Sequence, residues 1–318
     1  MTRRSGAAPF ALALALALAS GVAAAAPPSS PPPWLDAQGA AELGAGRPLV
    51  VLVVVPLCDE RLIACGSRAF GDPVRLATNL YWGALYGARR FFERPTSAYR
   101  PVSRFTAPVA PATEPRPAEL GAWLASGAPA PGEDAVLERA IYRREVDAAP
   151  FGLAAGGRVE QIVVLEAVRG DAIDAALARF YALAEGGGTV AFEDAGRVRR
   201  ERVHVAGYAG HNRLMDGVAL PASAGRTPGA ALPSFVLACA SEPYFAAPLA
   251  SAGSRALLLT RTLMAPEGYV IEATVDALGR GAAEPEIRAA AVAAYARWQS
   301  LAPAVAESVF ARPAPPAP

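Results

Sequence analysis

Hydrophobic residues gather in short unbroken runs along the chain, and amphipathic stretches separate most of these runs. The strongest run, 48–56, is almost entirely Val and Leu and shows no alternation with polar residues. A run of this length without alternation is typical of a parallel strand buried on both faces. We therefore interpret 48–56 as the central strand of a sheet. Further strands are expected at 140–146, 162–168, 189–192, 202–210, 233–238 and 255–260.

Apolar residues at helical spacing occupy much of the sequence between these strands. In 171–184, large apolar side chains recur every few residues until three consecutive glycines end the pattern. Strands that alternate with helices predict an α/β fold, in which helices cover both faces of a mostly parallel sheet. The other helices are expected at 34–43, 77–94, 242–252, 266–278 and 285–301, and a charged turn at 193–200.

The N-terminus has the pattern of a secretory signal. Two arginines precede an Ala/Leu-rich run at 7–19, and small residues before Pro27 offer a cleavage site. We predict that 1–26 is a cleaved signal peptide and that the mature protein is periplasmic or secreted, with no stable membrane anchor after cleavage. Residues 27–47 would then form a Pro-rich leader and a short helix.

The rest of the chain is expected to form one α/β domain, 48–303. A Pro-, Ala- and Thr-rich excursion near 95–133 interrupts it and contains one helical piece at 119–125. This excursion is interpreted as a lid, a prosegment-like cover or a plain surface loop, with room for a small strand pair. The end of the chain, 304–318, is interpreted as a Pro/Ala-rich tail, of which 311–318 is expected to be disordered.

Composition and motifs exclude several classes of function. The formal net charge is +1, which provides no electrostatic reason to expect a nucleic-acid partner. No glycine-rich nucleotide motif opens a helix, and no G-x-S-x-G elbow is present. The two histidines stand apart from any cluster of thiols or carboxylates, so neither a metal site nor a cofactor is expected.

Three cysteines remain to be explained. In an oxidising compartment Cys58 and Cys65 can pair and close a small loop, and their spacing is wrong for a C-x-x-C redox site. Cys239 is then left over. It is either a reactive thiol or a small buried apolar residue at the end of a strand.

The two histidines differ in position along one run. His204 stands mid-run between two valines, so its side chain is expected to face the core or a covering helix. His211 follows a glycine at the end of the run, where it can reach a cleft. If the runs ending at His211 and Cys239 pair in parallel, both residues lie where an open α/β sheet has its ligand site. A thiol beside an imidazole can act as a nucleophile.

Two segments carry a resemblance to a known family. The block 209–221, Ala-Gly-His-Asn-Arg-Leu-Met-Asp-Gly and on to Pro, resembles the His-Gly block of legumain-like cysteine peptidases. The block 238–245, Ala-Cys-Ala-Ser-Glu-Pro-Tyr-Phe, resembles their Ala-Cys-x-Ser block. The resemblance extends over roughly 200–278 and is to the caspase–legumain–gingipain clan. It implies a caspase-like three-layer sandwich and an exported cysteine peptidase that acts on a peptide or protein substrate.

The resemblance also implies roles for particular residues. Cys239 would be the nucleophile and His211 the general base or proton donor. The amides of Cys239 and Asn212 would help to form the oxyanion hole, with Ala240 close by. Arg261 in the primary specificity pocket would favour an acidic substrate side chain, whereas Asp59 or Glu267 would favour a basic one. The residues that could line this pocket are Asp59, Ser241, Thr260, Arg261 and Glu267.

The chain departs from the pattern of that branch at two positions. The glycine that follows the histidine is Asn212 here, and the acidic or amide residue that often precedes Ala-Cys is Leu237. These departures favour the alternative function, a catalytically inactive protein of the same fold that binds or organises partners outside the cytoplasm. The distance between Cys239 and His211 distinguishes the two. Substrate preference, zymogen processing and oligomeric state stay open.

Overall fold

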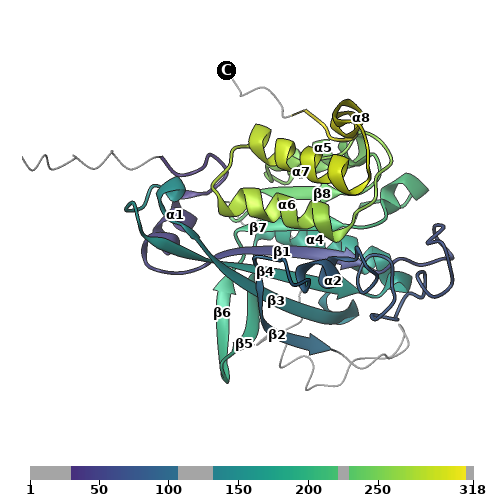
Figure 1. Cartoon of the computed structure of the whole chain (residues 1–318), viewed down its shortest axis with the longest axis horizontal. Coiled ribbons are helices and arrows are strands. Elements are labelled where there is room, and N and C mark those ends of the chain that lie inside the picture. Colours follow the sequence, from purple (N-terminus) through teal and green to yellow (C-terminus); the bar gives the residue numbers. More distant parts are fainter. Residues whose placement is uncertain (1–29, 107–131, 221–228, 313–318) are drawn as a thin grey trace, which may run out of the picture.

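The computed structural model describes residues 30–106, 132–220 and 229–312. Within these residues the chain forms a seven-stranded sheet in the order β2-β3-β4-β1-β7-β8-β9, with a separate β5–β6 hairpin. Helices lie against both faces of the sheet (Figure 1). The prediction of an α/β fold with a mostly parallel sheet is confirmed, and the arrangement is consistent with a caspase-like three-layer sandwich.

Strand β1 (Leu49–Pro56) is the centre of the sheet. All eight of its residues are buried. It pairs in parallel with β4 (Arg158–Val168) on one side and with β7 (Val205–Ala209) on the other. Strands β8 (Ser234–Leu237) and β9 (Ala256–Leu258) continue the parallel part beyond β7. The segments that follow β1, β7 and β8 therefore leave the sheet at one end, which we call the carboxyl edge.

The opposite side of the sheet is antiparallel. Strand β3 (Val136–Asp147) pairs with β4 and with β2 (Arg100–Thr106). β3 and β4 both begin earlier than the sequence pattern suggested. β2 lies within the excursion expected at 95–133, whose central part, including the helical piece expected at 119–125, lies outside the described residues.

The two faces of β1 bury different helices. Val50, Leu52 and Val54 belong to the core that includes α4 (Ile173–Gly186) and α5 (Ser241–Ser251). The alternate residues of β1 belong to the core on the other face (Figure 1). The helices of that second face are α1 (Ala37–Gly44), α2 (Ala88–Phe92), α6 (Gly268–Gly279), α7 (Glu284–Trp298) and α8 (Pro303–Val309). Short 3₁₀ turns are η1 (Glu133–Ala135), η2 (Ala149–Phe151), η3 (Gly170–Ala172) and η4 (Arg213–Asp216).

A buried charge network joins β3, β4 and α4. Glu166 accepts hydrogen bonds from Nε of Arg139 at 2.9 Å and from Nε of Arg179 at 3.0 Å. Arg139 also pairs with Glu133 of η1 at 2.9 Å. Burial alone would raise the pKa of Glu166, but the two guanidinium groups lower it to about 2. Removing one partner would leave a buried charge uncompensated, so this network holds α4 to the sheet.

The prediction of a helix over 77–94 is wrong for most of that range, because in this range the structure has only the short helix α2. The preceding residues form tight turns around the Asn79 side chain, which bonds to both backbone groups of Cys58. A Cβ at Gly83 would lie 2.1 Å from the carbonyl oxygen of Leu76, so the chain passes itself too closely for a regular helix.

The prediction of one continuous strand over 202–210 is also wrong, because two separate strands share this range. β6 (Arg197–Arg202) ends before β7 begins, and it pairs with β5 (Thr189–Asp194) outside the main sheet. The expected charged turn at 193–200 is therefore mostly strand. The hairpin turns at Ala195 and Gly196, both with positive φ, which is the geometry of a tight two-residue hairpin.

The C-terminal tail expected at 304–318 is ordered in its first part. Helix α8 packs on the second face, and Phe310 is fully buried and bridges to Thr260. The residues expected to form the signal peptide lie outside the described residues. Among the helices that the structure describes, none is both long and apolar enough to cross a membrane.

His204 is a structural residue, as its position in the sequence suggested. Its Nδ1 accepts the amide of Val50 at 3.1 Å, and its Nε2 lies 3.1 Å from Glu42 of α1. The side chain therefore joins the start of β1 to a covering helix. Burial is the largest cause that lowers the pKa of His204, to about 4.

Because the unfolded chain binds a proton at His204 before the folded chain does, acid should destabilise the protein. We expect the free energy of unfolding to fall by roughly 3 kcal/mol as the pH drops from about 6.5 to about 4. Denaturant unfolding at a series of pH values measures this dependence. In His204→Gln the slope in this window should flatten; parallel curves for the two proteins would contradict the assignment.

Candidate functional site

His211 and Cys239 follow neighbouring parallel strands and reach the carboxyl edge together. The ladder between β7 and β8 continues as far as a bond from the Gly210 amide to the Leu237 carbonyl, 3.1 Å long. Beyond it, Nδ2 of Asn212 donates to the carbonyl of Cys239 at 2.7 Å. The two segments are therefore held side by side past the end of the sheet.

Asn212 is the residue that makes this connection. It is fully buried, and its side-chain oxygen also accepts the amide of Leu214 at 3.2 Å, which caps η4. The glycine of the legumain-like pattern could make neither bond. The departure at this position thus supplies a link between the two candidate segments.

His211 has an acidic partner that the sequence reasoning missed. Its Nε2 lies 2.8 Å from Oδ2 of Asp216, which also accepts a hydrogen bond from Arg213 at 2.9 Å. Burial would raise the pKa of Asp216, but the bonds from His211 and Arg213 lower it. An ionised Asp216 favours the imidazole tautomer with its proton on Nε2, leaving Nδ1 to accept another proton. The available signal was an Asp five residues after the histidine, within one loop.

The Cys239 thiol is directed at a different segment. It is partly exposed, and Sγ lies 3.4 Å from both the amide and the carbonyl oxygen of Met264. Within the described residues no hydrogen bond joins Cys239 to His211. The two segments are neighbours, but the thiol and the imidazole each have another partner.

The backbone around Cys239 bears on the expected oxyanion hole. The amide of Ala240 donates to the carbonyl of Thr262 at 2.8 Å, so it is already engaged. Ala240 has a φ of 45°, a left-handed conformation that is costly for a residue with a Cβ. In the described part of the chain the amides of Asn212 and Cys239 have no acceptor. Cys239 is partly exposed, whereas Asn212 is fully buried, so of these amides only that of Cys239 lies on a residue that a ligand can reach.

Ser241 and Thr260 join two segments through buried hydrogen bonds. Both are fully buried. The Ser241 hydroxyl accepts the amide of Thr260 at 2.8 Å, and the Thr260 hydroxyl accepts the amide of Ser241 at 3.1 Å. Thr260 also donates to the carbonyl of Ala238. These bonds fasten the start of α5 to the end of the β9 segment.

Asp59 and Arg261 are already paired. Asp59 accepts bonds from the backbone and the guanidinium of Arg61, and these lower its pKa although burial would raise it. Arg261 is largely exposed and lies 3.5 Å from Glu242 of α5. Neither residue presents a lone charge to the Cys239 thiol.

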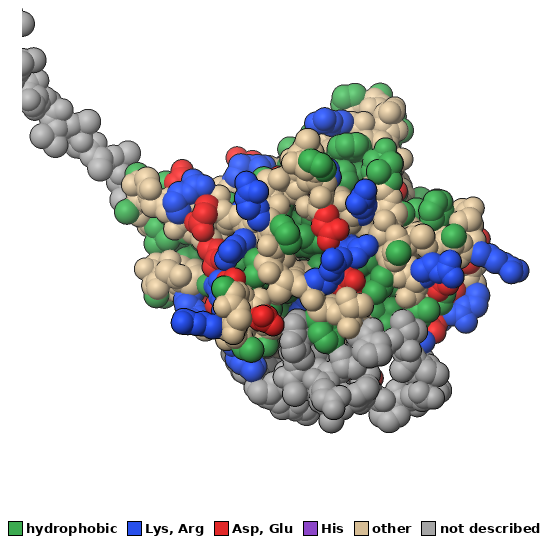
Figure 2. Space-filling view, turned by 60° about the horizontal axis from the view of Figure 1, so that its bottom comes forward, with side chains coloured by type: hydrophobic (Ala, Val, Ile, Leu, Met, Phe, Trp, Pro, Cys, Tyr) green, Lys and Arg blue, Asp and Glu red, His purple; other side chains and the backbone are tan. Residues whose placement is uncertain are grey.

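A shallow hollow of about 370 Å³ lies at the carboxyl edge beside the η4 segment. Its wall includes the Asp59–Arg61 pair and the pair that Arg213 forms with Asp174 at 3.3 Å. Charges of both signs therefore alternate around it. On the face of the molecule in Figure 2, basic and acidic side chains are likewise interspersed, in keeping with the near-zero net charge.

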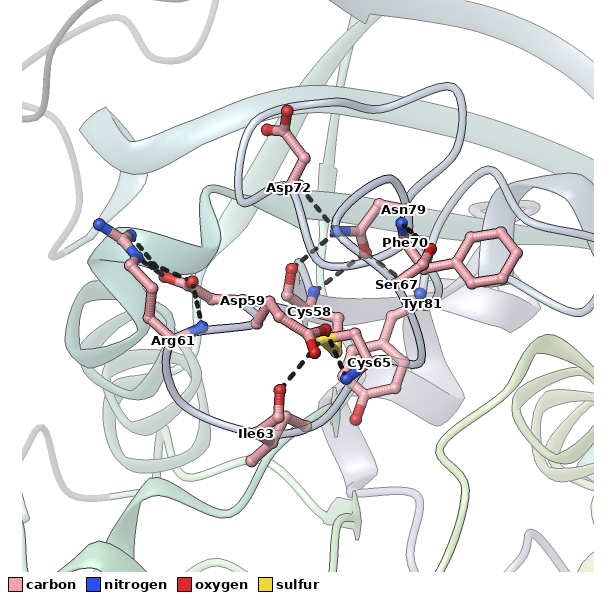
Figure 3. Close-up of a disulfide and its surroundings, with 11 residues drawn as sticks. Cys58, Asp59, Arg61, Ile63, Cys65, Ser67, Phe70, Asp72, Asn79 and Tyr81 are labelled. Atoms are coloured by element: carbon pink, nitrogen blue, oxygen red, sulfur yellow. Dashed lines mark hydrogen bonds and ion pairs between the residues drawn. A yellow bond between two sulfur atoms is a disulfide. The ribbon is translucent and has the colours of Figure 1, made fainter.

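The predicted disulfide between Cys58 and Cys65 is present, with the two Cα atoms 6.2 Å apart (Figure 3). It closes the loop that follows β1 at the carboxyl edge. Asn79 bonds to both backbone groups of Cys58, and its oxygen also accepts the amide of Tyr81 at 3.1 Å. The crosslinked loop and the Tyr81 segment are thus fixed to each other.

Comparisons with known proteins identify no relative. No family model matches the chain, no curated protein matches it, and no solved structure matches it. Among the described residues, no group of three or more His, Cys, Asp or Glu side chains could hold a metal ion.

Replacing Asn212 with glycine removes both of its buried bonds. Since the carbonyl of Cys239 and the amide of Leu214 would lose their partner, we expect the free energy of unfolding to fall by about 1–3 kcal/mol. Denaturant unfolding measures the loss. Met215→Ala is the matched control, because Met215 is exposed on the same short turn and should change stability by no more than about 0.5 kcal/mol. Equal stability of the glycine variant and the parent would refute the bridging role.

Proposed function

We propose that the protein is an exported hydrolase of the caspase/legumain type that cleaves an amide bond with Cys239 as nucleophile. The observation that supports this most is the bond from Asn212 to the carbonyl of Cys239, which holds the His211 and Cys239 segments together at the carboxyl edge. The bond from His211 to Asp216 adds a group that orients the imidazole.

The proposed reaction begins with transfer of the Cys239 proton to Nδ1 of His211. The sulfur then forms a bond to the substrate carbonyl carbon, and the π electrons move to the carbonyl oxygen. That oxygen faces the amide of Cys239. Collapse of this intermediate breaks the C–N bond, and the leaving amine takes the proton from His211. Water, deprotonated by His211, then hydrolyses the thioester.

This reaction requires the thiol to leave Met264 and turn toward the imidazole. Hydrogen bonds between catalytic groups are often long or absent without substrate and form only in the complex. The start of α5 lies two residues beyond Cys239, and the positive end of a helix dipole favours a nearby anion. Both features are compatible with a thiolate that forms on substrate binding.

The second candidate function is that of an inactive protein of the same fold that binds or organises a partner outside the cytoplasm. The observation in its favour is that Cys239 contacts Met264 while His211 contacts Asp216. For either function we propose a peptide or protein partner and no nucleic acid. We also propose a periplasmic or secreted location, because a disulfide accompanies the signal-like N-terminus.

Labelling with a thiol-directed electrophile, followed by intact mass, tests the catalytic proposal. A peptidyl acyloxymethyl ketone should add once to the wild type and not to Cys239→Ala. We expect His211→Ala to slow labelling by about 100-fold and Asp216→Asn by about tenfold or more, because the thiol loses its base or the base loses its orientation.

His204→Gln is the matched control, since it removes the other histidine at a distance from the proposed site. Its labelling rate per folded molecule should stay within about twofold of the wild type. Unchanged labelling of His211→Ala and Asp216→Asn would refute the catalytic role and favour the binding protein.

A further inference from the structure

One segment beside Cys239 is not used by the proposed reaction, and the inference drawn from it rests on the proposed function. The Cys239 thiol lies against the backbone of Met264. The next residue, Ala265, donates its amide to the hydroxyl of Tyr295 at 3.0 Å. Its carbonyl accepts the amide of Glu267 at 2.9 Å. This short segment therefore brings a thiol, a phenol and a carboxylate into one neighbourhood.

Glu267 differs from the other carboxylates around the site. Asp59, Asp216 and Glu242 each pair with an arginine. The carboxylate of Glu267 instead accepts a hydrogen bond from the Gln299 amide at 3.2 Å and one from the Tyr269 hydroxyl. Both partners are uncharged, and no arginine or histidine of the described residues lies within ion-pair distance of the carboxylate.

Glu267 is also only partly exposed, and burial is the main cause that raises its pKa. A partly buried carboxylate without a cation is unfavourable, and a positively charged group would stabilise it.

Tyr81 contributes a second group without a partner. The residue is only 7% exposed, yet its hydroxyl has no hydrogen-bond partner within the described residues. After burial, Cys239 and Glu267 are the causes that raise the pKa of Tyr81, so both groups act on its hydroxyl. Tyr81 comes from the segment that Asn79 fixes to the disulfide loop (Figure 3). Tyr81 belongs to the same buried core as Met264 and Tyr295, and its hydroxyl is free to accept a donor.

The other charged residues that could select the charge of a substrate side chain already have ion-pair partners. Arg261, which would select an acidic side chain, is exposed and paired with Glu242. Asp59 is neutralised by Arg61. Of the residues expected to line the specificity pocket, Glu267 is the one whose charge is uncompensated.

We propose that Glu267, with the hydroxyls of Tyr81 and Tyr295, binds the positively charged side chain of the substrate residue whose carbonyl is attacked. The preferred substrates are therefore peptides with lysine or arginine at that position. An ammonium or guanidinium group can donate to the carboxylate and to the phenol oxygens at once. An uncharged side chain of equal length would leave the charge of the Glu267 carboxylate uncompensated.

Two peptidyl acyloxymethyl ketones that differ only in the reactive residue, lysine or norleucine, test this proposal. Norleucine has the same aliphatic stem as lysine and lacks the amine. Rates of Cys239 labelling are measured by intact mass with the full mature chain. We expect the lysine probe to react about 10- to 100-fold faster with the wild type. Glu267→Gln should slow lysine labelling at least tenfold and norleucine labelling far less.

Two further variants serve as controls. Glu242→Gln removes an equal charge from the start of α5, three residues after Cys239, and should leave the ratio of the two rates within about twofold. Glu267→Asp keeps the charge and should retain a smaller preference for lysine. Thermal unfolding of Glu267→Gln checks the fold; glutamine can keep the bond to Gln299, so its melting temperature should stay close to that of the parent.

The outcomes separate this inference from the proposed function. No Cys239-dependent labelling by either probe would overturn the proposed function and this inference with it. Labelling without a preference for lysine, or with a preference that survives Glu267→Gln, would overturn the inference alone. If Glu267→Gln slows both probes equally, the carboxylate acts on the thiol and not on the substrate, which also overturns it.

Discussion

The burial of β1 on both faces determines where everything else in this protein lies. A strand with eight buried residues must have a neighbour on each side and a helical layer above and below. Its parallel pairing with β4 and β7 sends the connecting segments out at the same end of the sheet. The disulfide loop, the η4 segment and the Cys239 turn consequently meet at one edge, although they are far apart in the sequence.

Side-chain hydrogen bonds at that edge fix the neighbouring segments to one another. Asn212 joins the η4 segment to the Cys239 turn, and Ser241 with Thr260 joins the start of α5 to the end of the β9 segment. Asn79 joins the disulfide loop to the Tyr81 segment. Each of these side chains is fully buried and bonds to backbone groups that would otherwise lack a partner. Together they replace the regular ladder where the strands end.

The features that were predictable from the sequence are those with a local signature. The β1 run, the helical spacing of α4 and the positions of His211 and Cys239 at strand ends depend on neighbouring residues alone. The errors arose where distant contacts decide the conformation. The 77–94 stretch has a helical pattern, but Asn79 bonds to a residue 21 positions earlier, and that bond selects turns.

Similarly, Asn212 looked like a departure from a pattern because its acceptor, the carbonyl of Cys239, becomes visible only when β7 and β8 are paired. Asp216 was missed for a different reason: an acid near a histidine is common, and only the geometry of η4 brings the two side chains to 2.8 Å.

The crosslink between Cys58 and Cys65 has a consequence for how the edge is held together. Tyr81 is positioned through Asn79, and Asn79 is bonded to the backbone of one of the two cysteines. One wall of the edge therefore contains a covalent bond that forms by oxidation of the two thiols. The strands and helices are held by packing and hydrogen bonds, whereas the loop at this edge is also held by a bond that depends on the redox chemistry of the surroundings. Reduction of this disulfide would therefore act at the edge that carries His211 and Cys239, and not at the centre of the sheet.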